Sequence, residues 1–340
     1  MPHLIGLDIG GANLKAAHVD GVAVSQAFPV WKHPERLADA LTDLLKKFSQ
    51  VDGLAVTMTA ELADCFVTKD EGVNRILDAV ELAAAGRPVR VWQTGGEFVS
   101  IEEARLLTRL VAAANWHALA TWVGLMVPRG DALLIDIGTT TTDIIPIRDG
   151  LPDTLGRNDS ERLIAGELFY SGIRRTPVCA VARQVLFTGR SCPLAAELFA
   201  TMLDVYLLLG DIDEDPSDCD TANGRPATRR EACGRLARMI CCDQEEVSHE
   251  EAMVMARTIA ACQQGSIRMA IEHVMSRRKE AFGHVIFSGA GAFLAERVID
   301  EQLPSLKAVP RVRLTDLLPG EVVEAACAFA VARLAAERLV

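Results

Sequence analysis

Residues 132–147 read ALLIDIGTTTTDIIPI, and this stretch decides the fold that the sequence predicts. Apolar, β-branched runs flank residues 136–138 (Asp-Ile-Gly), which is the pattern of two strands joined by a tight turn. The same layout occurs 128 residues earlier, where residues 4–19 read LIGLDIGGANLKAAHV and residues 8–10 repeat Asp-Ile-Gly. Because one strand–turn–strand unit occurs twice, the sequence predicts two related lobes that each begin with a hairpin.

Strand-like and helix-like segments alternate around the two hairpins, and this alternation predicts an α/β fold with a largely parallel central sheet. Helices are expected to begin at Pro34 and near Ile101, and to cover residues 70–85, 249–275 and 321–339. Further strands are expected over residues 54–57, 89–92 and 283–287.

The duplication also predicts the domain organisation. The first lobe is expected over residues 1–128 and the second over 129–318, with a helical insertion around 160–280, and the last helix (319–340) is expected to return to the first lobe. A ligand cleft is expected between the lobes. Residues 110–127 carry no formal charge, and we interpret them as a buried helix that leads into a strand rather than as a membrane span.

The charge balance argues against binding driven by nucleic-acid phosphates. The 340 residues include 46 acidic and 35 basic ones, giving a formal net charge of −11, and no basic run is longer than residues 277–279. Nine scattered cysteines without a Cys-x-x-Cys pair fit reduced thiols. We therefore expect a cytoplasmic enzyme that acts on small molecules, without nucleic-acid or membrane partners, and a homodimer is left open.

The first turn combines groups that bind phosphate and metal. Gly10 and Gly11 lack a Cβ, so backbone N–H groups there can face an anion directly. Asn13 lies in the same turn, and Lys15 can meet a phosphate as a point charge. Asp8 can hold Mg²⁺ directly or through water. The alternative for one such copy is an ordinary hairpin turn.

The second turn offers hydroxyl groups as hydrogen-bond donors. Its candidate anion-binding residues are Gly138, Thr139, Thr140 and Thr141. Asp136 and Asp143 are further candidate ligands for Mg²⁺. Two such turns facing each other across a cleft would clamp a diphosphate with its metal. Threonines chosen only for strand propensity are the alternative, but the repeated Asp-Ile-Gly favours the clamp.

A third glycine turn follows the strand expected over residues 283–287. Ser288, Gly289 and Gly291 lead from this strand into a helix, whose N-terminus favours negative charge. The turn lacks the six-residue spacing of dinucleotide-binding loops, so alone it is a weak signal. Its value comes from its position after the two hairpins.

Together the three turns resemble the actin, Hsp70 and sugar-kinase superfamily, whose duplicated, ribonuclease H-like fold has two lobes. Several segments narrow this to a resemblance with the hydantoinase/oxoprolinase-like family, in its branch associated with tetrahydromethanopterin-linked one-carbon transfer. They are residues 7–15, 57–64, 166–177, 199–206 and 221–225, of which 166–177 is the most specific. The branch usually has aspartate where this chain has Asn223, so no carboxylate role is carried over there.

The resemblance implies a transferase of methanofuran-type cofactor biosynthesis. The branch includes enzymes that join an aminomethylfuran diphosphate to the phenol oxygen of γ-glutamyltyramine, so an ether forms and pyrophosphate leaves; a tyrosine or tyramine analogue is an alternative acceptor. The resemblance implies Mg²⁺ at Asp8, Asp136 and Asp143, with Asp8 counted as catalytic. Glu167 and Asp204 are the candidates for the base that takes the phenol proton. The alternatives are a capping role or an ion pair with Arg174 or Arg175 for Glu167, and a solvated helix face for Asp204.

An ATP-dependent small-molecule kinase or an oxoprolinase-like ATPase is the alternative function, since most proteins of this architecture bind ATP and fold does not determine function. An ATP enzyme needs an adenine pocket beside residues 289–291, whereas the transferase needs an aromatic slot for furan and phenol. Trp92, Trp116 and Tyr170 are candidates for that slot. The arginines at 174–175 are candidates for binding a glutamyl carboxylate. An actin-like scaffold is a third alternative.

Overall fold

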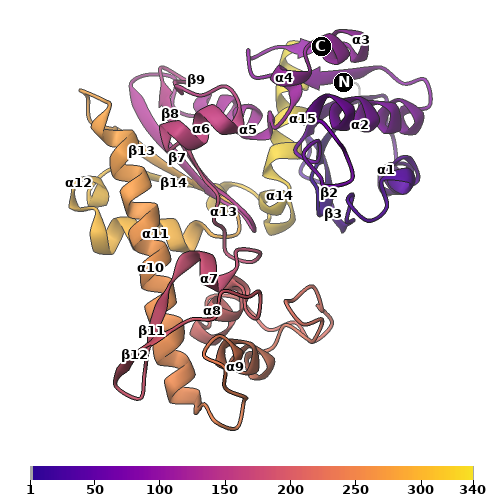
Figure 1. Ribbon diagram of the computed structural model, residues 1–340. Coiled ribbons are helices and arrows are strands. Elements are labelled where there is room, and N and C mark those ends of the chain that lie inside the picture. Colours follow the sequence, from indigo (N-terminus) through magenta and orange to yellow (C-terminus); the bar gives the residue numbers. More distant parts are fainter. Residues whose placement is uncertain (1–2, 340) are drawn as a thin grey trace.

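Each Asp-Ile-Gly hairpin begins one of two mixed β-sheets, and these sheets form the centres of two lobes (Figure 1). The computed structural model describes residues 3–339. The first sheet consists of β1 (Leu4–Ile9), β2 (Asn13–His18), β3 (Ala23–Ala27), β4 (Gly53–Met58), β5 (Val89–Trp92) and β6 (Phe98–Val99). Its strand order is β3-β2-β1-β4-β5-β6, in which β1, β4 and β5 are parallel.

The second sheet repeats this arrangement. It consists of β7 (Asp131–Ile137), β8 (Thr142–Arg148), β9 (Leu151–Pro152), β10 (Leu168–Phe169), β13 (His284–Ser288) and β14 (Arg311–Arg313). The order is β10-β8-β7-β13-β14, with β9 beside β8, and β7, β13 and β14 are parallel. In both sheets an antiparallel hairpin is followed by two parallel strands, which confirms the predicted α/β fold with a duplicated core.

The helices near the first sheet cover both of its faces. They are the 3₁₀ helix η1 (Pro34–Arg36), α1 (Leu37–Leu45), α2 (Lys69–Ala84), α3 (Ile101–Leu106), α4 (Thr108–Val111) and α5 (Asn115–Gly124). Helices α1 and α2 contact each other and pack on β2 and β4. The C-terminal helix α15 (Ala326–Arg338) packs against β1, β2 and β4, so the end of the chain lies beside its beginning (Figure 1).

The second lobe carries a long extension between β9 and β13. The extension contains α6 (Asp159–Ala165), α7 (Val178–Val181), α8 (Met202–Leu209), α9 (Arg229–Arg238), α10 (His249–Ser276) and a hairpin of β11 (Gln184–Phe187) and β12 (Arg190–Pro193). Ser248 and Glu251 form the capping box that begins α10. After β13 follow α11 (Ala292–Gln302), α12 (Pro304–Lys307), α13 (Leu314–Leu317) and α14 (Gly320–Glu324). The insertion is therefore not purely helical, because the β11–β12 hairpin belongs to it.

Helix α5 is the buried helix expected within residues 110–127. Nine of its ten residues are buried, and it contacts α15, β4, β8 and β9. No helix within residues 3–339 has the length and apolar composition that crossing a bilayer requires.

Alternation along the strands directs two carboxylates toward the same space. The odd-numbered residues 5–9 of β1 are buried with α1 and α2, and the odd-numbered residues 133–137 of β7 are buried in the core that contains α10. Successive side chains of a strand point to opposite faces, so Asp8 and Asp136 face the layer of α5 and α15 between the sheets. Both carboxylates lie close enough to Cys327 of α15 to raise the pKa of its thiol, after burial itself.

The layer between the sheets depends on a close approach of β1 and α15. A Cβ at Gly6 would lie 1.9 Å from the carbonyl oxygen of Ala328 and 2.9 Å from the amide nitrogen of Ala332. No side chain fits between these two backbones, so glycine at position 6 determines how deeply α15 sits against the sheet.

Gly6→Ala should therefore destabilise the protein by about 1–3 kcal/mol or more, because the added methyl group must push α15 away from β1. The free energy of unfolding from urea titration measures the effect. Gly265→Ala is the matched control, since a Cβ at this position in α10 would meet nothing within 4 Å and alanine favours a helix by about 0.5–1 kcal/mol. Equal stability of the two variants would contradict the expected role of Gly6.

Candidate functional site

The two hairpin turns line one cleft with a volume of about 550 Å³. The first hairpin contributes Asp8, Gly10, Gly11, Asn13 and Lys15 to its lining. The second hairpin contributes Asp136, Gly138, Thr139, Thr140, Thr141 and Asp143. The structure thus brings together the candidate residues of both turns, although they are far apart in the chain.

Both turns are closed by the same backbone hydrogen bond. The Gly10 amide donates to the Asn13 carbonyl at 3.0 Å, and the Gly138 amide donates to the Thr141 carbonyl at 2.9 Å. A Cβ at Gly10 would lie 2.9 Å from the Asn13 carbonyl oxygen, so the first turn favours glycine. Tight turns of this kind expose successive backbone N–H groups, which makes them suited to anions.

The two hairpins differ in charge at one equivalent position, which is Lys15 in the first and Asp143 in the second. Asp8 pairs across its hairpin with Lys15, whereas Asp136 pairs across its hairpin with Asp143. Side chains of such cross-strand partners lie on the same face of the sheet. Asp143 also accepts a hydrogen bond from Arg162 Nη2 at 2.7 Å. One side of the cleft therefore holds a carboxylate beside an ammonium group, and the other holds two carboxylates beside a guanidinium group.

Burial makes two of these carboxylates unusual acids. It raises the pKa of Asp8, an effect that Lys15 partly opposes. Burial, followed by the neighbouring Asp143 carboxylate, raises the pKa of Asp136 to about 6. Among the described residues, Asp8 Oδ1 has no hydrogen-bond partner. Carboxylates that are costly to bury as anions are typical of sites that bind a cation.

The carboxylates of Asp8, Asp136 and Asp143 fit a Mg²⁺ ion whose coordination is completed by its ligand. Within residues 3–339, no three His, Cys, Asp or Glu side chains form a ready metal cage. Mg²⁺ commonly keeps several waters and takes one or two carboxylates together with substrate phosphates. The unpartnered oxygen of Asp8 and the adjacent Asp136–Asp143 pair have the chemistry for this role.

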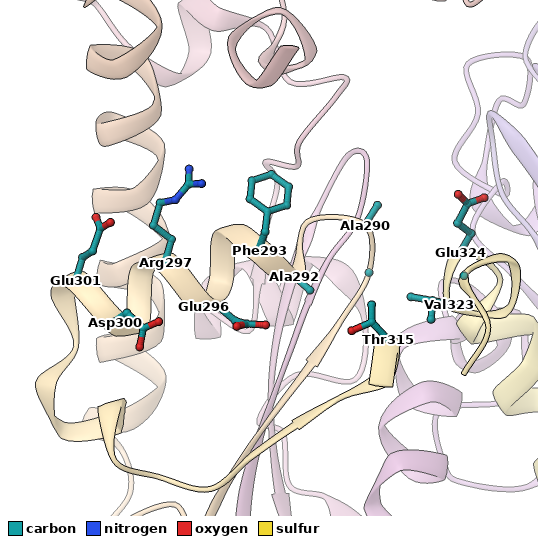
Figure 2. Close-up of a pocket in the computed structure, with 12 residues that line it drawn as sticks. Ala290, Ala292, Phe293, Glu296, Arg297, Asp300, Glu301, Thr315, Val323 and Glu324 are labelled. Atoms are coloured by element: carbon teal, nitrogen blue, oxygen red, sulfur yellow. The ribbon is translucent and has the colours of Figure 1, made fainter. Parts of the chain in front are cut away.

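The third glycine turn lies beside Asp136 but opens onto another cavity. Ser288 is the strand neighbour of Asp136, and the Gly291 amide donates to the Ile137 carbonyl at 2.8 Å. Gly289 has a φ of +81°, and a Cβ there would lie 2.6 Å from Asp136 Oδ1. Gly289 lines a second cavity, of about 690 Å³, between α11 and α14 (Figure 2).

Glu167 does not line the main cleft, which corrects its assignment as a base. Its buried carboxylate accepts hydrogen bonds from the backbone amides of Leu155 at 2.8 Å and Gly156 at 3.1 Å. Arg277 Nη2 donates to the same group at 3.1 Å. Glu167 is therefore a structural residue, as in the ion-pair alternative, although its partner is Arg277 rather than Arg174 or Arg175.

Asp204 is likewise held inside the extension. It accepts from the Thr201 amide at 2.9 Å in a capping box that begins α8, and from Arg235 Nε at 2.7 Å. The carboxylate is buried, so neither a base facing the cleft nor a solvated helix face describes it. Arg235 also donates to Asn223 Oδ1 at 3.2 Å, so the amide of Asn223 takes part in the same structural cluster.

Residues 166–177 support the second turn from behind. A Cβ at Gly172 would lie 2.5 Å from the Gly138 carbonyl oxygen. Thr142 Oγ1 donates to the Ser171 carbonyl at 2.7 Å, and Gln263 Nε2 of α10 donates to Ser171 Oγ at 2.7 Å. This segment is distinctive because it must approach the turn closely and align it.

Of the aromatic and arginine candidates, some line the cleft and others do not. Trp116, Tyr170 and Arg175 line it. Trp92 is fully buried elsewhere and donates to His117 Nδ1 at 3.3 Å. Arg174 is ion-paired with Asp218.

The cleft also contains side chains that sequence reasoning did not assign to it. They are Trp31, Glu61, Asp64, Asp159 and Arg162. Glu61 and Asp64 lie within residues 57–64, which the family resemblance had singled out, so that segment carried a usable signal. The other three stand in segments without a local motif, and only tertiary packing brings them to the cleft.

Comparison with known proteins identifies relatives of this chain. The family model for hydantoinase/oxoprolinase matches residues 52–338. The (4-{4-[2-(γ-L-glutamylamino)ethyl]phenoxymethyl}furan-2-yl)methanamine synthase of Methanocaldococcus jannaschii is 37% identical over 303 residues, which cover 88% of this chain and 89% of the relative. The protein of the same name from Methanococcus vannielii is 36% identical over 126 residues, 37% of this chain and 56% of the relative.

Solved structures share the fold at low identity. A nucleotide-free acetone carboxylase has a TM-score of 0.53 and 11% identity, covering 88% of this chain and 67% of its own. The Lmo2764 protein from Listeria monocytogenes, assigned provisionally to the N-acetylmannosamine kinases, has a TM-score of 0.51 and 14% identity, covering 99% of this chain and 100% of its own. The family match and the identity to the M. jannaschii synthase show that this chain belongs to the hydantoinase/oxoprolinase family.

Proposed function

We propose that this protein is a transferase of methanofuran-type cofactor biosynthesis. In the proposed reaction, the phenol oxygen of γ-glutamyltyramine, or of a related tyramine or tyrosine derivative, displaces pyrophosphate from an aminomethylfuran diphosphate. The proposal is supported best by the cleft, whose lining combines two glycine turns suited to anions with the aromatic side chains of Trp31 and Tyr170. The 37% identity to a synthase whose named product contains the corresponding phenoxymethylfuran ether agrees with it.

The proposed reaction defines what the cleft must stabilise. The bond between the furfuryl carbon and the diphosphate oxygen breaks, and its electron pair leaves with the pyrophosphate. The phenol oxygen bonds to the same carbon and loses its proton. Negative charge grows on the leaving group while positive charge grows on the furan. The site must therefore bind a developing anion and exclude water, which competes for the activated carbon.

The two hairpin turns supply groups of the right kind for the leaving group. Lys15 and the backbone amides of residues 11–13 would bind one part of the diphosphate, and the hydroxyls of residues 139–141 the other. Mg²⁺ held by Asp8 with Asp136 or Asp143 would add positive charge beside the leaving oxygens.

Aromatic and cationic side chains of the cleft suit the acceptor. Trp31 and Tyr170 offer surfaces on which furan and phenol rings can stack. Trp116 is buried, and the guanidinium carbon of Arg162 lies 4.0 Å from its ring centre. The guanidinium carbon of Arg175 lies 5.1 Å from the ring centre of Trp31. A planar guanidinium binds a carboxylate with two parallel hydrogen bonds, so Arg175 is our candidate for the glutamyl carboxylate.

ATP-dependent phosphoryl transfer is a second candidate, and one observation favours it. The cavity between α11 and α14 adjoins Gly289, so a nucleotide base bound there would lie beside the hairpin turns (Figure 2). Its lining includes four carboxylates, those of Glu296, Asp300, Glu301 and Glu324. Arg297 also lines the cavity, and Glu296 and Asp300 are paired with Arg313 and Arg311, so part of this negative charge is balanced. We rank this function second because the relatives similar in sequence are named as synthases.

Purified protein incubated with Mg²⁺ and the aminomethylfuran diphosphate should release pyrophosphate only when γ-glutamyltyramine is present, and mass spectrometry should detect the ether. ATP alone is the parallel control. Phosphate release from ATP without ether formation would contradict the transferase proposal and favour ATP-dependent phosphoryl transfer.

Asp8→Asn should lower the rate of ether formation by at least about 100-fold, because the substitution removes charge from the group beside the leaving oxygens. The amide is almost isosteric, and the pKa of Asp8 is raised by burial, so the melting temperature should not fall. Single-turnover pyrophosphate release and thermal unfolding measure the two effects. Near-normal turnover would refute the assigned role of Asp8.

Arg175→Gln should raise KM for γ-glutamyltyramine by about 10-fold or more, since a charge-assisted hydrogen bond contributes about 1.5–3 kcal/mol. Tyramine lacks the glutamyl carboxylate, so its KM should change little in the same variant. Steady-state kinetics with both acceptors test the assignment, and an equal loss for both would show that Arg175 does not read the carboxylate.

A further inference from the structure

Glu61 is a cleft carboxylate that strand pairing places beside the first turn. The amides of Thr59 and Ala60 donate to the Ile9 carbonyl at 2.9 and 3.1 Å, which extends the β1–β4 pairing beyond β4. Glu61 follows directly and lines the cleft. The Glu61 backbone packs directly against α2, because a Cβ at Gly72 would lie 2.1 Å from the Glu61 carbonyl oxygen.

The side chain of Glu61 is buried without full hydrogen bonding. It is 1% exposed, and its Oε2 has no partner among the described residues. Burying a polar atom without a hydrogen-bond partner is unfavourable. Asp64, in the same loop and lining the same cleft, is exposed to solvent. Glu61 is therefore the carboxylate of this loop whose free oxygen is shielded from water.

A residue with a strained backbone lies near this carboxylate. Ala113 has a φ of +47°, a left-handed conformation that is unfavourable for a non-glycine residue. Its backbone amide lies close enough to the Glu61 carboxylate to oppose slightly the rise of the Glu61 pKa, and Ala113 itself lines the cleft. Backbone strain of this kind clusters at functional sites. Trp116, three residues further along, also lines the cleft, with the Arg162 guanidinium over its ring.

The charged groups around Glu61 come from several elements. Lys69 begins α2, Asp159 lies in the first turn of α6, and Asp64 lies in the same loop. Arg162 is engaged by Asp143. Burial raises the pKa of Glu61 to about 7, the Asp159 carboxylate adds to the rise, and Lys69 opposes it. A base of this strength is suited to accepting a proton near neutral pH.

We propose that Glu61 is the general base of ether formation, an inference that rests on the function proposed above. The phenol proton passes to the free carboxylate oxygen of Glu61. The electron pair of the phenol oxygen forms the bond to the furfuryl carbon, and the bond to the diphosphate breaks as its electron pair leaves with pyrophosphate. The step creates one carboxylic acid, one ether and one pyrophosphate, and needs no further reactant.

Glu61→Gln should lower kcat for ether formation by about 100-fold or more. In the wild type, kcat/KM should rise with pH through about 7, where Glu61 loses its proton, and the variant should lack this limb of the profile. Fluorinated acceptors, whose phenols ionise at lower pH, should restore activity to the variant more than they accelerate the wild type. Glu245→Gln removes the same charge from an exposed position in the other lobe and should leave the rate unchanged.

Stability provides a readout independent of catalysis. An acid whose pKa is raised by folding destabilises the folded state increasingly as pH rises from its unfolded value toward its folded value, here from 4.5 to about 7. Glu61→Gln should therefore melt a few degrees higher than the wild type at pH 8, with the difference shrinking toward pH 4.5.

The outcomes separate the two proposals. If the wild type forms no ether, the proposed function and this role for Glu61 both fail. If the wild type forms ether and the variant keeps its rate and pH profile, the role of Glu61 alone fails. It also fails if the variant loses activity but melts lower than the wild type and gains nothing from acidic phenols, because Glu61 would then be structural.

Discussion

The contact between β1 and α15 is the constraint on which the rest of the molecule depends. Alanine residues dominate the buried face of α15, and Gly6 lets the backbone of that helix touch the strand. A similar approach joins α5 to the second lobe, since a Cβ at Gly124 would lie 2.2 Å from the Gly150 carbonyl oxygen. Small residues therefore bring the two sheets close enough for the ends of β1 and β7 to share one cleft.

This close packing also supports groups that are unfavourable in a folded protein. Asp8, Asp136 and Glu61 all have raised pKa values because burial disfavours their charged forms. The apolar cores on the outer faces of both sheets offset that cost. In β1 and β7, the apolar side chains that stabilise the fold lie on one face. The cleft carboxylates Asp8 and Asp136 lie on the other face, near the C-terminal end of each strand.

Local sequence patterns predicted the hairpins and the residues of their turns, because strand period and glycine geometry act over a few neighbouring positions. They failed for Glu167 and Asp204, which stand in distinctive segments. The distinctiveness there comes from packing and capping: Gly172 must touch the second turn, and Thr201 and Asp204 begin α8. A family-specific sequence segment therefore indicates residues that must pack closely, and these residues need not be catalytic.

Trp31, Asp159 and Arg162 show what sequence patterns cannot predict. Each is unremarkable among its sequence neighbours, and each reaches the cleft because elements distant in the chain pack together. The left-handed backbone of Ala113 is also unpredictable from the sequence, because nothing distinguishes Ala113 from the alanines on either side of it. Such positions become visible only when burial and hydrogen bonding are known in three dimensions.

The two hairpins descend from one pattern yet differ where Lys15 in one copy corresponds to Asp143 in the other. A cleft between identical halves would offer a ligand two equivalent orientations. Reversing one charge removes that equivalence and gives the space a polarity from end to end. An unsymmetrical molecule with an anionic tail and a carbon that becomes electron-poor then has only one favourable way to lie. In this chain, the repeated hairpins form the cleft, and the charge difference between Lys15 and Asp143 makes its two ends unlike.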